Sequence, residues 1–179
     1  MSRRNVHDRE LLDFLDALEP EIYTGTVWRT TWKGRDPLLG SRGGGRWSPD
    51  NEFEVLYTSL KKNVSLAELY HHLSTAPVFS SRVVVISQLR VESARVLNIN
   101  AEKLMSLGVT KTSAADYQRS QAIGAAANFL GYQGVLVPSV RRDGVNLVFF
   151  TERLDVNVLA IAKDAEEINW PAWIERSRL

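Results

Sequence analysis

Hydrophobic residues recur along the chain at two spacings, and each spacing predicts one kind of element. Over residues 9–18, leucine and phenylalanine recur every three or four positions, which predicts a helix that Pro20 ends. The same period predicts further helices at 64–73, 100–108, 113–130 and 170–178. In the second of these, Asn100 is the expected N-cap and Gly108 the expected end. Helices are therefore expected from one end of the chain to the other.

Runs of β-branched and aromatic residues predict the strands. The clearest run is YTGTVWRTTW at 23–32. Shorter runs predict strands at 55–58, 83–86, 94–99, 134–137, 145–150 and 156–161. Asp143-Gly144 predicts a hairpin turn between two of them. Because strands and helices do not alternate regularly, the order favours an α+β fold over a doubly wound α/β sheet.

A loop dense in glycine and proline, residues 33–51, separates the first two strands, and SRGGGRW lies within it. Glycine lets a backbone approach a ligand closely, backbone N–H groups can hold an anion, and arginine grips phosphate with two hydrogen bonds. The loop has neither the spacing of a dinucleotide-binding fingerprint nor the Gly-Lys-Ser/Thr of a P-loop. Taken alone, it is more simply a flexible surface loop.

Composition narrows the classes of protein. The 179 residues, 44% hydrophobic and 24% charged with a net charge of +1, are typical of one globular domain and point to neither nucleic acid nor membrane. Without cysteine, no disulfide framework or thiolate metal site can form. The charged N-terminus lacks the apolar core of a signal peptide, and no apolar run reaches the roughly 20 residues that span a bilayer. We therefore expect a cytoplasmic protein.

Two charged residues in structured segments have competing interpretations. Arg29 shares a strand face with Val27, and a charge buried there needs a ligand or a carboxylate, unless its stem lies at a strand edge. The segment Ser65–Glu68 matches a capping box, in which Glu68 bonds a backbone N–H at the helix start, and spacing alone favours that interpretation. The alternative is a carboxylate in a cleft that stabilises positive charge on a sugar carbon.

The remaining polar candidates are weaker. Ser139 follows a strand but lies in no Gly-x-Ser-x-Gly motif, so a hydrolase nucleophile is not expected. Asn146 and Gln121 are, from spacing alone, plain hydrogen-bonding groups. The three histidines are His7, His71 and His72, and no two of them have the i, i+4 spacing of a helical metal site. We expect no bound metal.

Five short motifs follow one another between about Tyr23 and Phe150 in an order that resembles the RES domain, named for its arginine, glutamate and serine. They are Trp28-Arg29, Gly44-Gly45-Arg46-Trp47, Leu56-Tyr57-Thr58-Ser59, Ala67-Glu68, and GVLVPS at 134–139 followed by Asn146. The chain departs from the family at Ser48, where asparagine is frequent.

The resemblance implies a fold similar to the diphtheria-toxin type of ADP-ribosyltransferase, α+β with a mixed, split sheet and flanking helices. One RES-like domain would span 1–179, with its motifs at about 23–150, an N-terminal helix at 9–18 and a C-terminal extension at 151–179. The implied function is the toxin of a bacterial type II toxin–antitoxin system that cleaves the nicotinamide–ribose bond of NAD by hydrolysis or phosphorolysis. Transfer of ADP-ribose to a cellular protein and a non-catalytic nucleotide-binding module are the alternatives.

The implied partner is an Xre-type helix-turn-helix antitoxin, through which alone the chain would meet nucleic acid. The matched positions are Arg29, Arg46, Tyr57, Glu68, Gln121, Ser139 and Asn146. By resemblance, Arg29 and Arg46 clamp the pyrophosphate and ribose of NAD, Tyr57 stacks on the nicotinamide, and Glu68 stabilises the ribose cation. The last three positions would complete the NAD-binding set, with Ser139 and Asn146 orienting ribose or nicotinamide.

Overall fold

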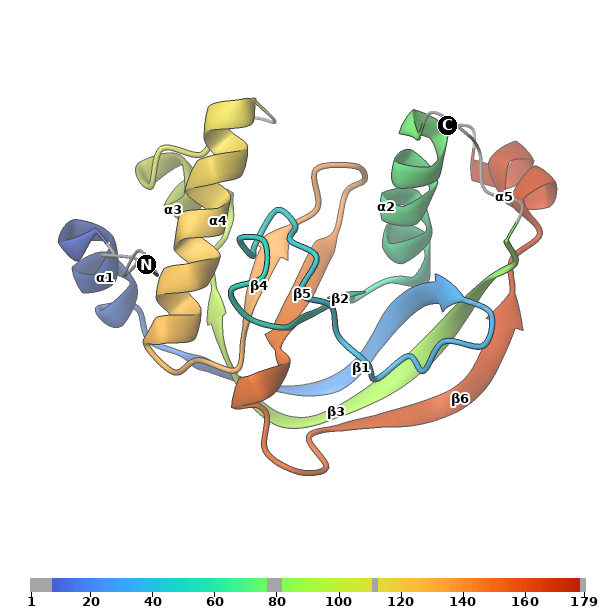
Figure 1. Ribbon diagram of the computed structural model, residues 1–179, viewed down its shortest axis with the longest axis horizontal. Helices are drawn as coiled ribbons and strands as arrows, with labels where there is room; N and C mark the ends of the chain where they lie inside the picture. Colours follow the sequence, from blue (N-terminus) through green and yellow to red (C-terminus); the bar gives the residue numbers. More distant parts are fainter. Residues whose placement is uncertain (1–7, 77–81, 111–112, 178–179) are drawn as a thin grey trace.

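Six strands form one mixed sheet in the part of the chain that the computed structural model describes, residues 8–76, 82–110 and 113–177. They are β1 (Glu21–Trp32), β2 (Val55–Ser59), β3 (Val84–Asn98), β4 (Gly134–Pro138), β5 (Val145–Phe150) and β6 (Leu159–Glu167). Their order is β1-β2-β5-β4-β3-β6, and only β3 and β4 pair in parallel. Because β1 also pairs with β3, the sheet bends back on itself, with the long β1, β3 and β6 in one half and the short β2, β5 and β4 in the other (Figure 1).

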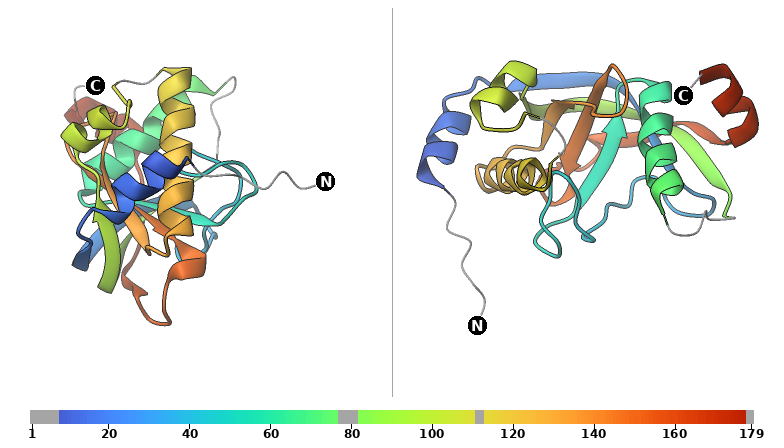
Figure 2. Two further views of the ribbon diagram at one scale, coloured as in Figure 1. Left: turned by 90° about the vertical axis from the view of Figure 1, so that its left-hand side faces the viewer. Right: turned by 90° about the horizontal axis from the view of Figure 1, so that it is seen from above.

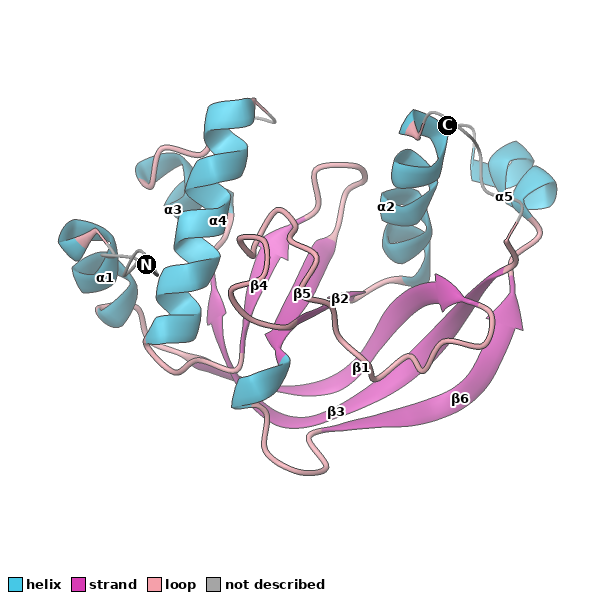
Figure 3. Cartoon of the chain, viewed as in Figure 1, coloured by secondary structure: helices cyan, strands magenta, loops and turns pink. Residues whose placement is uncertain are grey.

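The helices lie in two groups beside the short strands (Figure 3). They are α1 (Arg9–Asp16), α2 (Lys62–Thr75), α3 (Ala101–Ser106), α4 (Ala114–Phe129) and α5 (Trp170–Ser177), with a 3-10 helix, η1 (Thr151–Arg153), after β5. The view from above keeps α1, α3 and α4 together at one end of the sheet and α2 and α5 at the other (Figure 2). None of the described helices is long and apolar enough to cross a bilayer.

Buried apolar side chains hold each helix group to the sheet. Leu11 and Leu15 of α1 and Ile123 of α4 pack with Val135 of β4 and Phe150 of β5. A second cluster fills the inside of the bent sheet, and it includes Val27, Leu56, Leu89, Leu147 and Phe149. A third cluster joins α2 to α5. Each fully buried side chain of this size stabilises the fold by about 1.5–3 kcal/mol.

The five predicted helices are all present, with boundaries within a few residues of those predicted. Asn100 caps α3 as predicted, because its side chain accepts a hydrogen bond from Lys103 N–H at 3.0 Å. Ser113 caps α4 and forms a capping box with Asp116. Of the predicted helix at 170–178, the last residue lies outside the described residues.

The strands at 83–86 and 94–99 were predicted as separate, and that was wrong, because they are the two ends of the continuous β3. β1 pairs with β3 along almost its whole length and makes it one strand, although the alternation in its middle is short, with Leu89 and Val91 buried on either side of the exposed Arg90. β6 begins later than the predicted strand at 156–161 and runs further, because its extent follows its pairing with β3. β4 and β5 form the predicted antiparallel pair, joined by residues 139–144.

Candidate functional site

A cavity of about 490 Å³ lies between α2, the strands β1, β2 and β5, and the glycine-rich loop. Its lining includes five of the seven residues singled out from the sequence, namely Arg29, Arg46, Tyr57, Glu68 and Asn146. These residues come from segments far apart in the chain, and the sheet and α2 bring them together. The cavity is therefore the candidate active site. The other two residues, Gln121 and Ser139, are not among its lining residues.

Glu68 is held by two hydrogen bonds on one oxygen. Its Oε1 accepts from Ser139 Oγ at 2.6 Å and from Asn146 Nδ2 at 2.8 Å, while Oε2 has no hydrogen-bond partner among the described residues. The capping-box interpretation was wrong, because α2 already begins at Lys62 and its N-cap makes no side-chain hydrogen bond. Ser65 is consequently a buried residue inside the helix, and Glu68 points at the β4–β5 loop and β5.

Asn146 is fixed from its other side by Ser59. The two residues face each other in the β2–β5 register, and Ser59 Oγ donates to Asn146 Oδ1 at 2.7 Å. With its oxygen occupied by this hydroxyl, Asn146 presents its NH₂ to Glu68. Ser59 was not singled out from the sequence, although it closes the Leu56–Ser59 motif, because its facing Asn146 depends on a strand register that local spacing does not reveal.

Ser139 connects Glu68 to the β4–β5 loop. Besides donating to Glu68, its Oγ accepts the backbone N–H of Arg141 at 3.2 Å and that of Arg142 at 3.4 Å. The hydroxyl thus has one proton directed at the carboxylate and two donors directed at its lone pairs, which orients it. Arg141 lines the cavity as well.

The glycine-rich loop is packed against Tyr57 and is no free surface loop. Tyr57 Oη accepts the backbone N–H of Trp47 at 3.1 Å, and Trp47 is only 3% exposed. A Cβ on Gly45 would lie 2.3 Å from Tyr57 Oη, so only glycine fits there. Burial raises the pKa of Tyr57, which keeps its phenol protonated and able to donate.

Gln121 of α4 holds the same loop from behind and is absent from the cavity lining. Its Nε2 donates to Gly45 O at 2.9 Å and to Ser48 O at 3.2 Å. One turn along α4, Gly124 permits direct contact with the loop, since a Cβ there would lie 1.9 Å from Trp47 O. The predicted contact of Gln121 with NAD stays a prediction, and the contacts observed are with the loop backbone.

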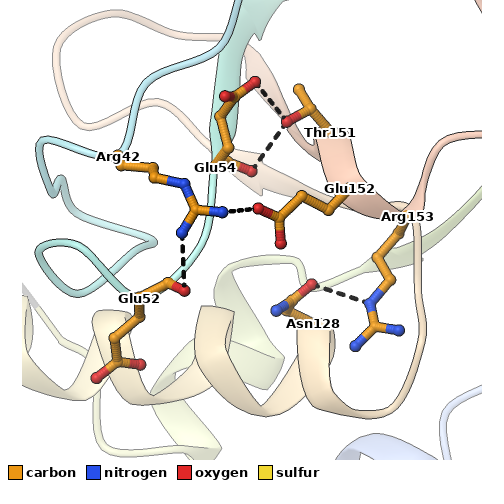
Figure 4. A network of polar contacts seen from close by, with 7 residues as sticks. All are labelled: Arg42, Glu52, Glu54, Asn128, Thr151, Glu152 and Arg153. Carbon is orange, nitrogen blue, oxygen red and sulfur yellow. Dashed lines mark hydrogen bonds and ion pairs between the residues drawn. The ribbon is translucent and has the colours of Figure 1, made fainter.

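Salt bridges and hydrogen bonds anchor the far end of the loop (Figure 4). Arg42 donates to the backbone oxygen of Glu52 and forms an ion pair with Glu152 of η1. Next to it, Thr151 Oγ1 donates to Glu54 Oε1 at 2.8 Å. The loop is therefore tied to the segment that follows β5 as well as to α4.

Arg29 is a buried cation without a carboxylate partner among the described residues. It is 7% exposed, and its two terminal nitrogens donate to Leu39 O at 2.8 Å and Tyr57 O at 3.4 Å. Nε has no partner in the described part of the chain. Burial first and the charge of Arg35 second lower the pKa of Arg29 to about 10. Neither the salt bridge nor the stem reaching solvent from a strand edge, the alternatives considered from the sequence, is realised, and a cation so placed favours a bound anion.

Arg46 lies nearer to Glu68. Burial first and the neighbouring charge of Arg141 second lower its pKa, while Asp116 and Glu68 oppose the shift. No cluster of three histidine, aspartate or glutamate side chains that could hold a metal occurs in the described ranges, and His7 lies outside them. The chemistry open to the cavity's own residues is therefore the binding of anions by guanidinium groups and the stabilisation of a cation by one carboxylate.

The family model for the RES domain matches residues 26–171. The chain belongs to the RES domain family. The NAD(+) phosphorylase MbcT of Mycobacterium tuberculosis, like that of Mycobacterium bovis, is 27% identical to it over 156 residues, or 82% of this chain and 84% of the relative. A chain in the crystal structure of the Mycobacterium tuberculosis MbcT–MbcA toxin–antitoxin complex superposes with a TM-score of 0.80 at 24% identity, covering 96% of this chain and 99% of the other. That likeness shows a shared fold.

The arginine, glutamate and serine that name the RES domain do not all contact one another. Ser139 and Glu68 are bonded to each other, whereas the charges that act on Arg29 are those of Arg35, Asp36 and Glu54. At the position where the family often has asparagine, Ser48 is buried and its Oγ lies 3.5 Å from Tyr57 Oη. The serine thus keeps a polar contact with the phenol.

Proposed function

We propose that this RES domain is a toxin that consumes NAD by breaking the bond between nicotinamide and ribose. The main support is one observation: Glu68, Arg29, Arg46 and Tyr57 line a single cavity. The naming of the 27% identical relative as an NAD(+) phosphorylase supports the same reaction. A dinucleotide carries negative charge on its pyrophosphate and positive charge on its pyridinium ring, and the cavity offers groups for both.

Arg29 and Arg46 bind the pyrophosphate and the adjacent ribose in this proposal. Forked guanidinium groups suit phosphate oxygens, and a bound anion would offset the desolvation of the buried Arg29. The phenol ring of Tyr57 offers its face to the pyridinium cation. Because the loop backbone and Gly45 fix Tyr57, its ring is oriented before the substrate arrives.

Glu68 stabilises the positive charge that builds on the ribose carbon as nicotinamide leaves. Ser139 and Asn146 donate to one carboxylate oxygen and so fix the orientation of the carboxylate. The other oxygen is left for the substrate. Catalysis in this scheme is electrostatic and positional, since a cationic leaving group departs as a neutral molecule and the enzyme has only to favour the ribose cation.

Phosphate is the proposed acceptor of the ADP-ribosyl group, because the relative is named a phosphorylase. The structure of the MbcT–MbcA toxin–antitoxin complex supports a protein antitoxin as partner. We place this antitoxin in the Xre-type helix-turn-helix class, over the mouth of the cavity. We also assign the bent sheet to the ADP-ribosyltransferase fold, and the whole chain, 1–179, to one RES-type domain.

The test is incubation of the purified chain with NAD, with and without inorganic phosphate, followed by chromatography of nicotinamide and the ribosyl product. Nicotinamide release that depends on phosphate supports the proposal. Binding of NAD in calorimetry without any nicotinamide release would instead favour a non-catalytic module. A discrete labelled band from biotin-NAD in a lysate would favour transfer to a protein. Glu68→Gln is the matched inactive control.

A further inference from the structure

The β4–β5 loop, residues 139–144, places two neighbouring arginines differently. Arg141 lines the cavity and Arg142 does not. The loop stands next to α2 (Figure 1), and the hydrogen bond from Ser139 to Glu68 joins the two. The Arg141 side chain makes no hydrogen bond and no ion pair with the described residues, so its guanidinium is available to a ligand in the cavity.

Arg141 lies at the Glu68 end of the cavity. Its backbone N is 3.2 Å from Ser139 Oγ, which is 2.6 Å from Glu68 Oε1. The charge of Arg141 helps to lower the pKa of Arg46, and the charge of Glu68 acts on the same pKa in the opposite direction. The charges that act on Arg29 are a different set, namely those of Arg35, Asp36 and Glu54.

We propose that Arg141 binds the inorganic phosphate that accepts the ADP-ribosyl group, an inference that rests on the proposed function. Phosphate carries between one and two negative charges at neutral pH and would be repelled by a carboxylate in the same cavity. A guanidinium beside Glu68 offsets that repulsion and grips two phosphate oxygens at once. Arg141 and Glu68, the single carboxylate among the lining residues, face the same cavity, so the charge of Arg141 offsets that of Glu68 for an incoming anion.

The step balances without a further reactant. The carbon–nitrogen bond between ribose and nicotinamide breaks, and its electron pair goes to the ring nitrogen, which becomes neutral. A phosphate oxygen supplies the pair for the new carbon–oxygen bond, and hydrogen phosphate keeps its proton. Arg141 holds the incoming phosphate and takes no part in proton transfer.

The test compares Arg141→Gln with Arg142→Gln, two variants with the same charge change in the same loop. Nicotinamide release is measured while phosphate is varied at saturating NAD, and then while NAD is varied at saturating phosphate. Losing a charge-assisted hydrogen-bond pair should raise the KM for phosphate of Arg141→Gln about 10- to 100-fold, with the KM for NAD within about twofold. Arg142→Gln should keep the parent's KM for phosphate within about twofold, and Arg141→Lys should restore part of the loss.

Four results would overturn the proposal. A rise in the KM for NAD instead of phosphate would place Arg141 on the pyrophosphate of the substrate. Equal effects of the two glutamine variants would reduce its role to general surface charge. Phosphate-independent nicotinamide release by the parent would remove the acceptor phosphate while NAD cleavage stands, whereas no release at all by the parent would overturn the proposed function too.

Discussion

Replacing Ser59 by alanine tests whether the proposed catalytic carboxylate depends on a second cavity residue, which reaches Glu68 through Asn146. The change removes the hydroxyl that donates to Asn146 Oδ1 at 2.7 Å, at a position only 3% exposed. Asn146 should keep its NH₂ toward Glu68, because turning the amide over would set two oxygens against each other. The amide oxygen of Asn146 instead loses its hydrogen-bond donor, and the amide loses the restraint that this bond provides.

The magnitude follows from that lost partner. Asn146 is only partly buried, so leaving its amide oxygen without a donor costs about 1–2 kcal/mol, the lower part of the range for a buried acceptor. For a chain of this length, each kcal/mol lowers the melting temperature by about 2–4 °C. If one or two kcal/mol of the loss falls on the transition state through Glu68, kcat drops about 5- to 30-fold, with a smaller change in the KM for NAD.

Thr58→Val is the matched control, because Thr58 is equally buried and its Oγ1 donates to the backbone oxygen of Leu147 at 2.6 Å. It should lose similar stability with a smaller loss of kcat. Thermal denaturation and NAD turnover are measured on both variants. If Ser59→Ala and Thr58→Val lose kcat in equal proportion, the drop follows stability alone and the positioning argument for Ser59 is wrong.

Three further predictions concern other parts of the site. Glu68→Gln should keep the melting temperature within a few degrees and lower kcat at least about 100-fold, since a neutral amide cannot offset a ribose cation; a variant that turns over normally but melts early would return Glu68 to a structural role. Arg29→Ala should raise the KM for NAD about 10-fold or more by removing a charge-assisted contact, and unchanged kinetics would make Arg29 structural. Gly124→Ala should cost about 1–3 kcal/mol of stability by overpacking, because its Cβ would lie 1.9 Å from Trp47 O; a normal melting temperature would contradict that.

Helices and short strands were predictable because their signals are local. Leu11 and Leu15 repeat with the helical period, and a local capping group, Asn100, begins α3. β3 was split in the prediction because the alternation in its middle is short, with Leu89 and Val91 as its buried members, whereas pairing with β1 runs through the whole strand. The ends of β6 were likewise not predictable from a short window, because they follow its pairing with β3. Pairing between distant strands is a property of the whole fold, which no short window contains.

For the site, the sequence identified residue types but could mislead about their surroundings. Glu68 matches a capping box in a four-residue window, yet α2 begins earlier and the carboxylate turns to Ser139 and Asn146, 71 and 78 residues away. Family resemblance, by contrast, rests on the order of motifs along the whole chain, and the RES family match confirms it. The order of motifs along the chain therefore predicted the position of Glu68 in a cavity, whereas local spacing predicted a helix cap.

The distribution of charge explains why one cavity would suit NAD better than a simple nucleotide. Arg29 is buried beside the backbone oxygens of Leu39 and Tyr57, whereas Glu68 is hydrogen-bonded to residues of β5 and the β4–β5 loop. A nucleoside diphosphate would engage the buried guanidinium of Arg29 but would bring no positive charge to Glu68. In the proposed scheme NAD does both until nicotinamide leaves, and its loss removes the substrate cation that faces Glu68. The product would then lack that contact with the carboxylate, so the charge pattern that favours substrate binding also favours release after the bond is broken.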